Sequence, residues 1–313
     1  MAHAQRGLAG VGAPLARLYA VYDRKGPASI RWVSLPRFPQ SYPVSAMAHL
    51  SPHLQQIKER AKNFQSRFPQ VDNFPPSLSP DDGTEIARLV SRGISYYYTT
   101  RVFVKRQPHQ DELGTDISGR PAVNPYIADR LRNEAAALRF VAEHTTIPVP
   151  SLLGVWEDNG LVYLKTGLVE AGVELQSLHP SILPAAVEAV TAQLESSVLP
   201  QLRRLRRNFI GSADPALPVM PPRRLWEWKE CRKWPSMVKD TDQYVFCHTD
   251  LDRQNILVDP DTFRIVCILD WETAGFFPQE WELPYWKANG PQNKLQMSTN
   301  AKDGELASFD FSV

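Results

Sequence analysis

The segment "FCHTDLDRQNILVD", residues 246–259, combines a histidine, three carboxylates and an asparagine with a short apolar run near its end. A second apolar run, "RIVCILD", follows at residues 264–270. The intervening "PDTF" contains Pro and Asp, which are common turn formers, so the pattern predicts a β-hairpin. Such a hairpin would hold the polar side chains on a rigid support.

The expected register brings polar residues of both strands to one end of the hairpin. If the turn is centred between the two runs, antiparallel pairing places residues 256–258 opposite residues 267–269 and Asn255 across from Asp270. Taken singly, a loop aspartate is usually a turn former, and an asparagine at a strand start usually caps backbone groups. Their convergence at one end of the hairpin favours a functional cluster instead.

His248 and Asp250 lie in the loop that leads into this end of the hairpin. Phosphoryl transfer suits the cluster, because the enzyme has to position a hydroxyl group, hold Mg²⁺ against the phosphates and neutralise developing charge. An aspartate can accept the hydroxyl proton, and Asn and Asp oxygens suit Mg²⁺. The pattern therefore predicts Asp250 as the catalytic base and Asn255 and Asp270 as metal ligands, with His248 supporting the loop.

The motif "HTDLDRQN" followed by "ILDWE" closely resembles the H-x-D-x-x-x-x-N and D-x-[DE] elements of the aminoglycoside phosphotransferase family. The continuation "AGFFPQEWELPYW", residues 274–286, and "FIGSAD", residues 209–214, look like the fungal branch of that family. The resemblance extends over roughly residues 85–286. It implies a protein-kinase-like fold and transfer of the γ-phosphoryl group of ATP, with Mg²⁺, to a hydroxyl group of a small molecule.

The order of the expected elements indicates an α+β fold with two lobes. Short β-rich segments begin at residue 85, a helix is expected over residues 127–144, more strands follow, and the chain after residue 175 is mainly helical. A further helix is expected after Ser51, a candidate N-cap. The expected divisions are a partly disordered extension (1–80), a nucleotide-binding N-lobe (81–170), a catalytic C-lobe (171–290) and a disordered polar tail (291–313).

A site of this kind also needs a cation near the α- and β-phosphates, usually a strand lysine held by a helix carboxylate. Lys105 ends the β-rich segment "RVFVKR", and Glu134 lies within or beside the apolar face of the expected helix, where an unpaired carboxylate would be costly. The residues of this helix that are expected to be buried are Leu131, Ala135, Leu138 and Ala142. The resemblance implies the same Lys105–Glu134 pair, with Arg101 and Arg106 as alternatives to Lys105.

The loop expected over the phosphates is "SRGISYYY", residues 91–98, which offers Gly93 and Ser95 but no GxGxxG pattern. The resemblance places the connection between the lobes, and with it the backbone groups that meet adenine, in "YLKTGLVEAGVEL", residues 163–175. A typical strand-to-loop connection would have a similar sequence, so no single adenine contact is assigned.

The bulk composition argues against several partner classes. The net charge is +1, so the basic, aromatic runs at residues 201–209 and 221–234 are interpreted as solvated helix faces and packing tryptophans rather than a nucleic-acid surface. Trp226, Trp228 and Trp234 remain alternatives for an acceptor pocket. No run approaches the roughly 20 apolar residues of a membrane span. No sequence feature indicates an oligomeric state.

Three widely spaced cysteines without a CxxC pair favour a cytoplasmic protein with reduced thiols. Residues 1–46 contain a single acidic residue, Asp23, among several arginines, a composition that is also found in mitochondrial transit peptides. A disordered extension or a start at Met47 is the alternative interpretation of this segment.

Two observations keep a catalytically idle, nucleotide-binding module open as the alternative function. The chain lacks a Gly-rich loop, and the segment after Trp286 is short and polar, whereas many relatives have additional C-terminal helices on the acceptor side. The nature of the small-molecule acceptor is not set by the motifs, because a fold or family alone does not choose a substrate.

Overall fold

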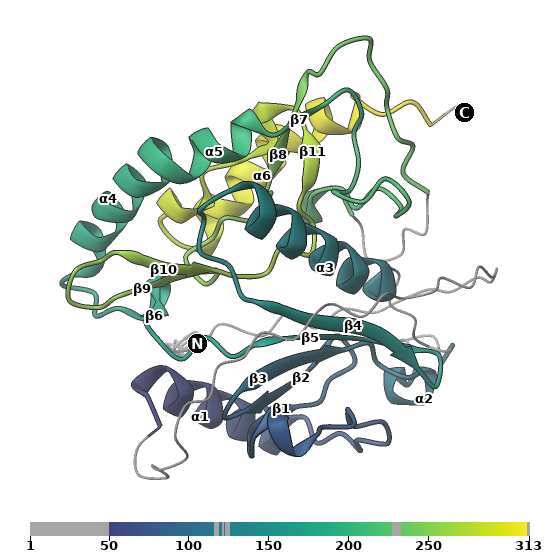
Figure 1. Cartoon of the computed structure of the whole chain (residues 1–313), viewed down its shortest axis with the longest axis vertical. Helices are drawn as coiled ribbons and strands as arrows, with labels where there is room; N and C mark the ends of the chain where they lie inside the picture. The colour runs from purple at the N-terminus through teal and green to yellow at the C-terminus, as the bar shows by residue number, and fades with distance from the viewer. Residues whose placement is uncertain (1–49, 116–118, 121, 123–125, 227–232, 312–313) are drawn as a thin grey trace, which may run out of the picture.

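The computed structural model of the chain describes residues 50–115, 119–120, 122, 126–226 and 233–311. The segment compared above with transit peptides, together with Trp228, lies outside these residues. The described part has a β-sheet lobe and a C-terminal lobe (Figure 1), which confirms the expected two-lobed α+β fold. None of its helices is both long enough and apolar enough to cross a membrane.

The N-terminal lobe is built on a five-stranded antiparallel sheet with the order β1-β2-β3-β5-β4 (Figure 1). Its strands are β1 (Glu85–Leu89), β2 (Ser95–Thr99), β3 (Val102–Arg106), β4 (Leu152–Asp158) and β5 (Leu161–Gly167). Helix α1 (Pro52–Arg67) packs beside β1, and the short helix α2 (Gln110–Leu113) follows β3. The Ser51 hydroxyl accepts a hydrogen bond from Leu54 N at 3.3 Å, so the expected cap is confirmed.

Helix α3 (Ile127–His144) has the expected bounds and lies between the sheet and the C-terminal lobe (Figure 1). Near its start, Leu131 and Ala135 pack against Val162 and Leu164 of β5. Near its end, Leu138 joins the core of the C-terminal lobe. The expected burial of Ala142 is wrong, because that residue is exposed. Val141, one position earlier, faces the core instead.

Side chains alternate between the two faces of the sheet, as the pleat of a strand requires. Val102, Val104 and Arg106 of β3 point to the face that is remote from α3, where Tyr97 and Tyr163 also pack. Lys105 points to the α3 face. The neighbours Lys105 and Arg106 therefore lie in different environments although both are buried.

The C-terminal lobe contains two small sheets, ordered β10-β9-β6 and β11-β8-β7. Their strands are β6 (Val173–Glu174), β7 (Arg206–Arg207), β8 (Tyr244–Cys247), β9 (Ile256–Val258), β10 (Ile265–Ile268) and β11 (Gly275–Phe277). Helix α4 (Leu183–Gln193) continues through a π-helical turn (Leu194–Val198) into α5 (Leu199–Arg204). Short 3₁₀ turns cover Pro80–Asp82, Leu175–Ser177, Arg223–Leu225, Gln279–Trp281 and Tyr285–Lys287.

The expected hairpin is formed by β9 and β10, but its register differs from the expectation by one residue at Ile256 and Leu257 and by two at Val258. Ile256 pairs with Ile268, Leu257 with Cys267, and Val258 with Ile265. The strand is irregular between Ile265 and Cys267, so a symmetrical turn was the wrong assumption. Asn255 consequently pairs with Leu269 rather than Asp270, with Leu269 N donating to Asn255 O at 2.8 Å.

The expectation of a disordered tail over residues 291–313 is wrong for its described part. Residues Pro291–Leu306 form helix α6, which begins with Pro directly after Gly290, a favourable helix start. The helix is fixed to the lobe by Glu305, whose carboxylate accepts two hydrogen bonds from Arg224, at 2.6 and 2.7 Å. This buried bidentate pair explains why a polar segment adopts a defined position.

Candidate active site

A cavity of about 550 Å³ lies between the sheet, α1 and the open end of the β9–β10 hairpin. Five of the predicted site residues line it: Lys105, Glu134, Asp250, Asn255 and Asp270. They come from β3, α3, the loop before β9, and the ends of the hairpin strands. The fold thus brings together residues that are up to 165 positions apart in the chain.

Lys105 binds two carboxylates at the centre of the cavity wall. Its Nζ lies 2.7 Å from Glu134 Oε2 and 2.6 Å from Asp270 Oδ1. The lysine and Glu134 are buried, whereas the Asp270 side chain is 34% exposed and faces the cavity. The cation therefore links α3 to the hairpin and remains next to an open space.

Burial and the contacts among these three side chains shift their pKa values. Burial alone would lower the pKa of Lys105, but Asp270 and Glu134 raise it well above its usual range. Burial opposes ionisation of Asp270, but Lys105, with smaller contributions from Arg130 and His248, lowers the pKa of this carboxyl below its usual value. For Glu134 burial dominates and raises the pKa to about 7. Lys105 is consequently charged and Asp270 ionised.

His248 is fully buried and hydrogen-bonds backbone groups on both sides of the site. Its Nε2 donates to Leu269 O at 2.9 Å, and its Nδ1 accepts from Asp250 N at 3.2 Å. Burial lowers the pKa of the imidazole, which suits the neutral tautomer that these bonds require. The ring joins the loop before β9 to the end of β10, and it is not among the residues that line the cavity.

Asn255 fixes the loop from the other side. Its Nδ2 donates to the backbone oxygen of Asp250 at 2.9 Å, which leaves Oδ1 as the atom that can ligate a cation. Asn255 and Asp270 offer oxygen atoms to the same cavity, and oxygen is the donor that Mg²⁺ prefers. Carboxylate oxygens of Glu134, Asp270 and Glu272 also lie within 4.8 Å of one another. The donor set therefore fits Mg²⁺.

Thr249 and Asp270 have left-handed backbone conformations, with φ of 69° and 65°. The conformation is unfavourable for a β-branched residue, so surrounding contacts have to impose it on Thr249. Thr249 N donates to Glu282 Oε1 at 3.1 Å, and Thr249 Oγ1 donates to Thr273 O at 3.1 Å. Glu282 also accepts from His248 N. Glu282 was not predicted as a site residue, although it lies in the quoted segment "AGFFPQEWELPYW", residues 274–286.

Helix α3 is tied directly to the segment that follows Asp270. Asn133, fully buried, donates from Nδ2 to Glu272 O at 3.0 Å and to Ala274 O at 2.9 Å. Arg130 forms an ion pair with the Glu272 carboxylate. The position of Glu134 on the same helix is therefore coupled to the hairpin end by side-chain and backbone contacts.

Lys294 of α6 reaches the proposed catalytic base. Its Nζ lies 2.9 Å from Asp250 Oδ1 and 2.6 Å from Asp252 Oδ2, and 4.5 Å from the ring centroid of Tyr285. Sequence analysis missed this contact because the tail was expected to be disordered. The Gly290–Pro291 pair was the available signal for a helix there.

Gly93 and Ser95 do not reach the cavity. Gly93 N donates to Ser91 Oγ at 3.1 Å, and the buried Ser95 hydroxyl accepts from Ser91 N at 3.2 Å. Both residues shape the β1–β2 loop, while Ser91 and Ile94 are the loop residues that line the cavity. The expected contacts of Gly93 and Ser95 with a nucleotide therefore stay a prediction, and the observed hydrogen bonds give both residues a role in shaping the loop.

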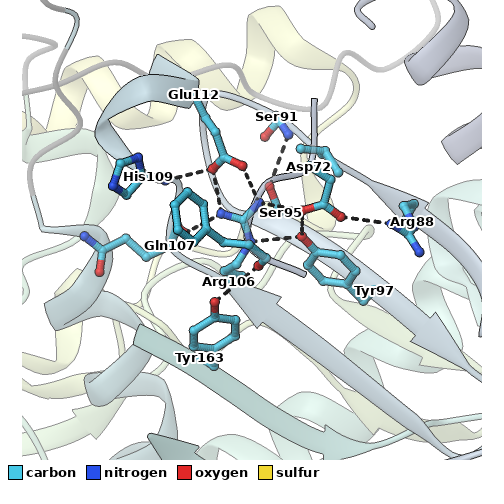
Figure 2. Close-up of polar contacts among 12 residues, drawn as sticks. Asp72, Arg88, Ser91, Ser95, Tyr97, Arg106, Gln107, His109, Glu112 and Tyr163 are labelled. Atoms are coloured by element: carbon cyan, nitrogen blue, oxygen red, sulfur yellow. Dashed lines mark hydrogen bonds and ion pairs between the residues drawn. The ribbon is translucent and has the colours of Figure 1, made fainter. Parts of the chain in front are cut away.

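The two alternatives to Lys105 lie elsewhere. Arg106 points to the other face of the sheet, where it binds Glu112 at 2.6 and 2.9 Å and Tyr97 Oη at 2.9 Å (Figure 2). Arg101 is exposed and contacts Asp81 O at 3.4 Å. Trp226 and Trp234 belong to the apolar core of the C-terminal lobe, and neither lines the cavity.

A protein-family model covers the part of the chain that builds most of this site. The model, described as "Phosphotransferase enzyme family" (APH), matches residues 95–283, more than half of the chain. The matched region includes Lys105, Glu134 and the whole hairpin. The comparison with curated proteins found no match.

Several solved structures are similar at low identity. Aminoglycoside-3'-phosphotransferase of type VIII is 17% identical with a TM-score of 0.38, over 80% of this chain and 92% of that chain. Aminoglycoside phosphotransferase APH(3'')-Id from Streptomyces rimosus ATCC10970 is 16% identical with a TM-score of 0.40, over 75% and 88%. A thermostable mutant of aminoglycoside phosphotransferase APH(4)-Ia, in a ternary complex with ADP and hygromycin B, is 14% identical with a TM-score of 0.38, over 71% and 80%.

Proposed function

Because this chain belongs to the phosphotransferase enzyme family, we propose that it transfers the γ-phosphoryl group of ATP to a hydroxyl group of a small molecule. The observation that carries the proposal is the convergence of Lys105, Asp250, Asn255 and Asp270 on one cavity. A cation, a base and two oxygen ligands are the groups that phosphoryl transfer needs, because its catalysis is mostly positioning and charge stabilisation.

Asp250 orients the acceptor hydroxyl and accepts its proton. One oxygen of this carboxylate contacts Lys294, and the other lies 3.5 Å from Asn255 Nδ2, too far for a strong hydrogen bond. The second oxygen is therefore the better placed to take the hydroxyl proton. His248 holds the backbone of Asp250 through a hydrogen bond and takes no part in proton transfer.

Lys105 binds the phosphates of the nucleotide, and Glu134 orients its ammonium. Asn255 Oδ1 and the Asp270 carboxylate would hold Mg²⁺, which would screen the phosphate charge. Asp270 contacts Lys105 directly, so nucleotide binding redistributes the lysine between this carboxylate and the phosphates.

The test compares Asp250→Asn with Asp261→Asn, which changes an exposed aspartate at the hairpin turn. Phosphate transfer is measured across a panel of polar hydroxyl compounds, and Mg-ATP affinity is measured separately by calorimetry. Asp250→Asn should lower transfer by on the order of 10²-fold or more and leave Mg-ATP affinity nearly unchanged. Transfer at the wild-type rate in this variant would remove Asp250 from the mechanism.

The Lys294 contact favours a second candidate, a nucleotide-binding module without transfer activity. In that case the ammonium of Lys294 keeps Asp250 from acceptors, since it already occupies one carboxylate oxygen. Wild type would then bind Mg-ATP and phosphorylate no acceptor of the panel. Appearance of transfer in Lys294→Ala would identify this contact as the cause.

A further inference from the structure

Helix α1 lies outside the part of the chain that the family model matches, yet it forms one side of the cavity. Its apolar lining residues are Ile57, Ala61, Phe64 and Phe68, the last of these at its C-cap. The spacing of four, three and four residues places them on one face of the helix. Phe64 and Ile57 are half-buried, so parts of both side chains remain open to the cavity.

Side-chain contacts fix α1 at both ends of the cavity. Arg60 donates two hydrogen bonds to the Glu174 carboxylate of β6, at 2.6 and 3.0 Å. At the other end, Gln65 Oε1 accepts a hydrogen bond from Val90 N, directly after β1. The helix therefore spans from the connection between the lobes to the start of the β1–β2 loop.

Other residues that line the cavity have the composition of a site for a flat base. Tyr98 and Phe103 of the sheet and Leu257 of β9 line the cavity, as does the backbone connection at residues 166–169. Apolar and aromatic side chains cover the faces of a planar ring. In the connection, the N–H groups of Gly167 and Leu168 already donate to Ser151 O and Arg101 O, both at 2.8 Å. The phosphate-binding end, with Lys105 and Asp270, belongs to the same cavity.

We propose that α1 is a wall of the nucleotide site, with Ile57 and Phe64 covering the base and sugar of ATP. This inference rests on the proposed function, because it takes the cavity to be the ATP site. Space of about 550 Å³ remains with α1 in place, so the helix borders the cavity and does not fill it. The β1–β2 loop has no GxGxxG pattern, and α1 supplies cover that this short loop does not.

The experiment measures the affinities of the full chain for Mg-ATP and for adenosine by calorimetry in three proteins. These are the wild type, Phe64→Ala and the control Glu59→Ala, which changes an exposed residue on the opposite face of α1. Phe64→Ala should weaken both ligands by about tenfold, because the base loses an aromatic contact. Glu59→Ala should match the wild type. Thermal unfolding without ligand shows whether each variant is folded, and Phe64→Leu provides a milder change at the same position.

The outcomes separate this inference from the proposed function. If the wild type binds Mg-ATP and Phe64→Ala binds it equally well or more tightly, α1 is not a wall of the site, while the proposed function stands. If the wild type binds neither ligand, both fall. Loss of affinity in Phe64→Ala, with a smaller loss in Phe64→Leu and none in Glu59→Ala, supports the inference.

Discussion

Two adjacent residues of β3, Lys105 and Arg106, each lie at the centre of a buried charge cluster. Each cation binds two carboxylates: Glu134 and Asp270 for Lys105, and Asp72 and Glu112 for Arg106. The Arg106 side chain is 0% exposed, and its donors are satisfied by carboxylates, Tyr97 and a backbone oxygen (Figure 2). The Lys105 cluster instead borders the cavity.

The two clusters differ in whether their charged groups can still bind a ligand. Around Arg106 all three guanidinium nitrogens donate to groups of the chain itself, so the cluster fixes the segment near Asp72 and helix α2 to the sheet. Around Lys105 an exposed part of Asp270 and the cavity leave room for a ligand. A buried cation next to carboxylates is therefore functional here only where it meets open space.

The largest expected effect on stability is that of Arg106→Met. Removal of the guanidinium leaves Glu112 buried without its partner, so the free energy of unfolding should fall by about 3–5 kcal/mol. Arg88→Met, which breaks ion pairs of a partly exposed arginine on the same face, should cost about 1 kcal/mol or less. Urea denaturation of both variants measures the two values, and similar losses would refute the contrast.

The effect of Lys105→Met should appear in activity. Phosphate transfer should fall on the order of 10²-fold or more, since the charge on the phosphates loses its cation. The free energy of unfolding should fall less than in Arg106→Met, because water from the cavity can reach Asp270. If Lys105→Met keeps the wild-type transfer rate, the distinction between the two clusters is wrong. It is also wrong if Lys105→Met loses as much free energy of unfolding as Arg106→Met.

The smallest expected effect concerns pH. Burial raises the pKa of Glu134 to about 7 from an ordinary value of 4.5, so the folded protein binds this proton more tightly than the unfolded chain. The contribution is fully present below pH 4.5 and is lost as the pH rises through about 7. Relative to Glu134→Gln, the wild type should lose on the order of 1 kcal/mol of stability across this window. If the free energies of unfolding of the wild type and Glu134→Gln change in parallel from pH 5 to 8, the raised pKa of Glu134 is contradicted.

Local sequence patterns were sufficient to predict the hairpin, the bounds of α3 and the convergence of Asp250, Asn255 and Asp270. They also indicated a paired carboxylate at Glu134, because an amphipathic helix placed the glutamate beside a buried face, whereas Lys105 as its partner was implied by the resemblance. Alternation along β3 could not by itself show which cation faces the cavity. That choice depends on the side of the sheet that α3 covers, a tertiary property.

Contacts between distant segments account for what sequence reasoning missed. The irregularity in β10 shifted the hairpin register, and no turn residue signalled it. Helix α6 is polar and was mistaken for a disordered tail, although its buried pair with Arg224 fixes it. Helix α1 was predicted, but its place on the cavity depends on Arg60 meeting Glu174, which is 114 residues away in the chain.

The central claim is that Mg-ATP binds at the hairpin end through Asp270. Its most direct test is thermal unfolding with and without millimolar Mg-ATP, in the wild type and in Asp270→Ala. Ligand at about 100 times its dissociation constant should add roughly 2.7 kcal/mol to the free energy of unfolding. The melting temperature of the wild type should rise with Mg-ATP in a Mg²⁺-dependent way, and this rise should be absent in Asp270→Ala. An equal rise in both proteins, or none in the wild type, would contradict it.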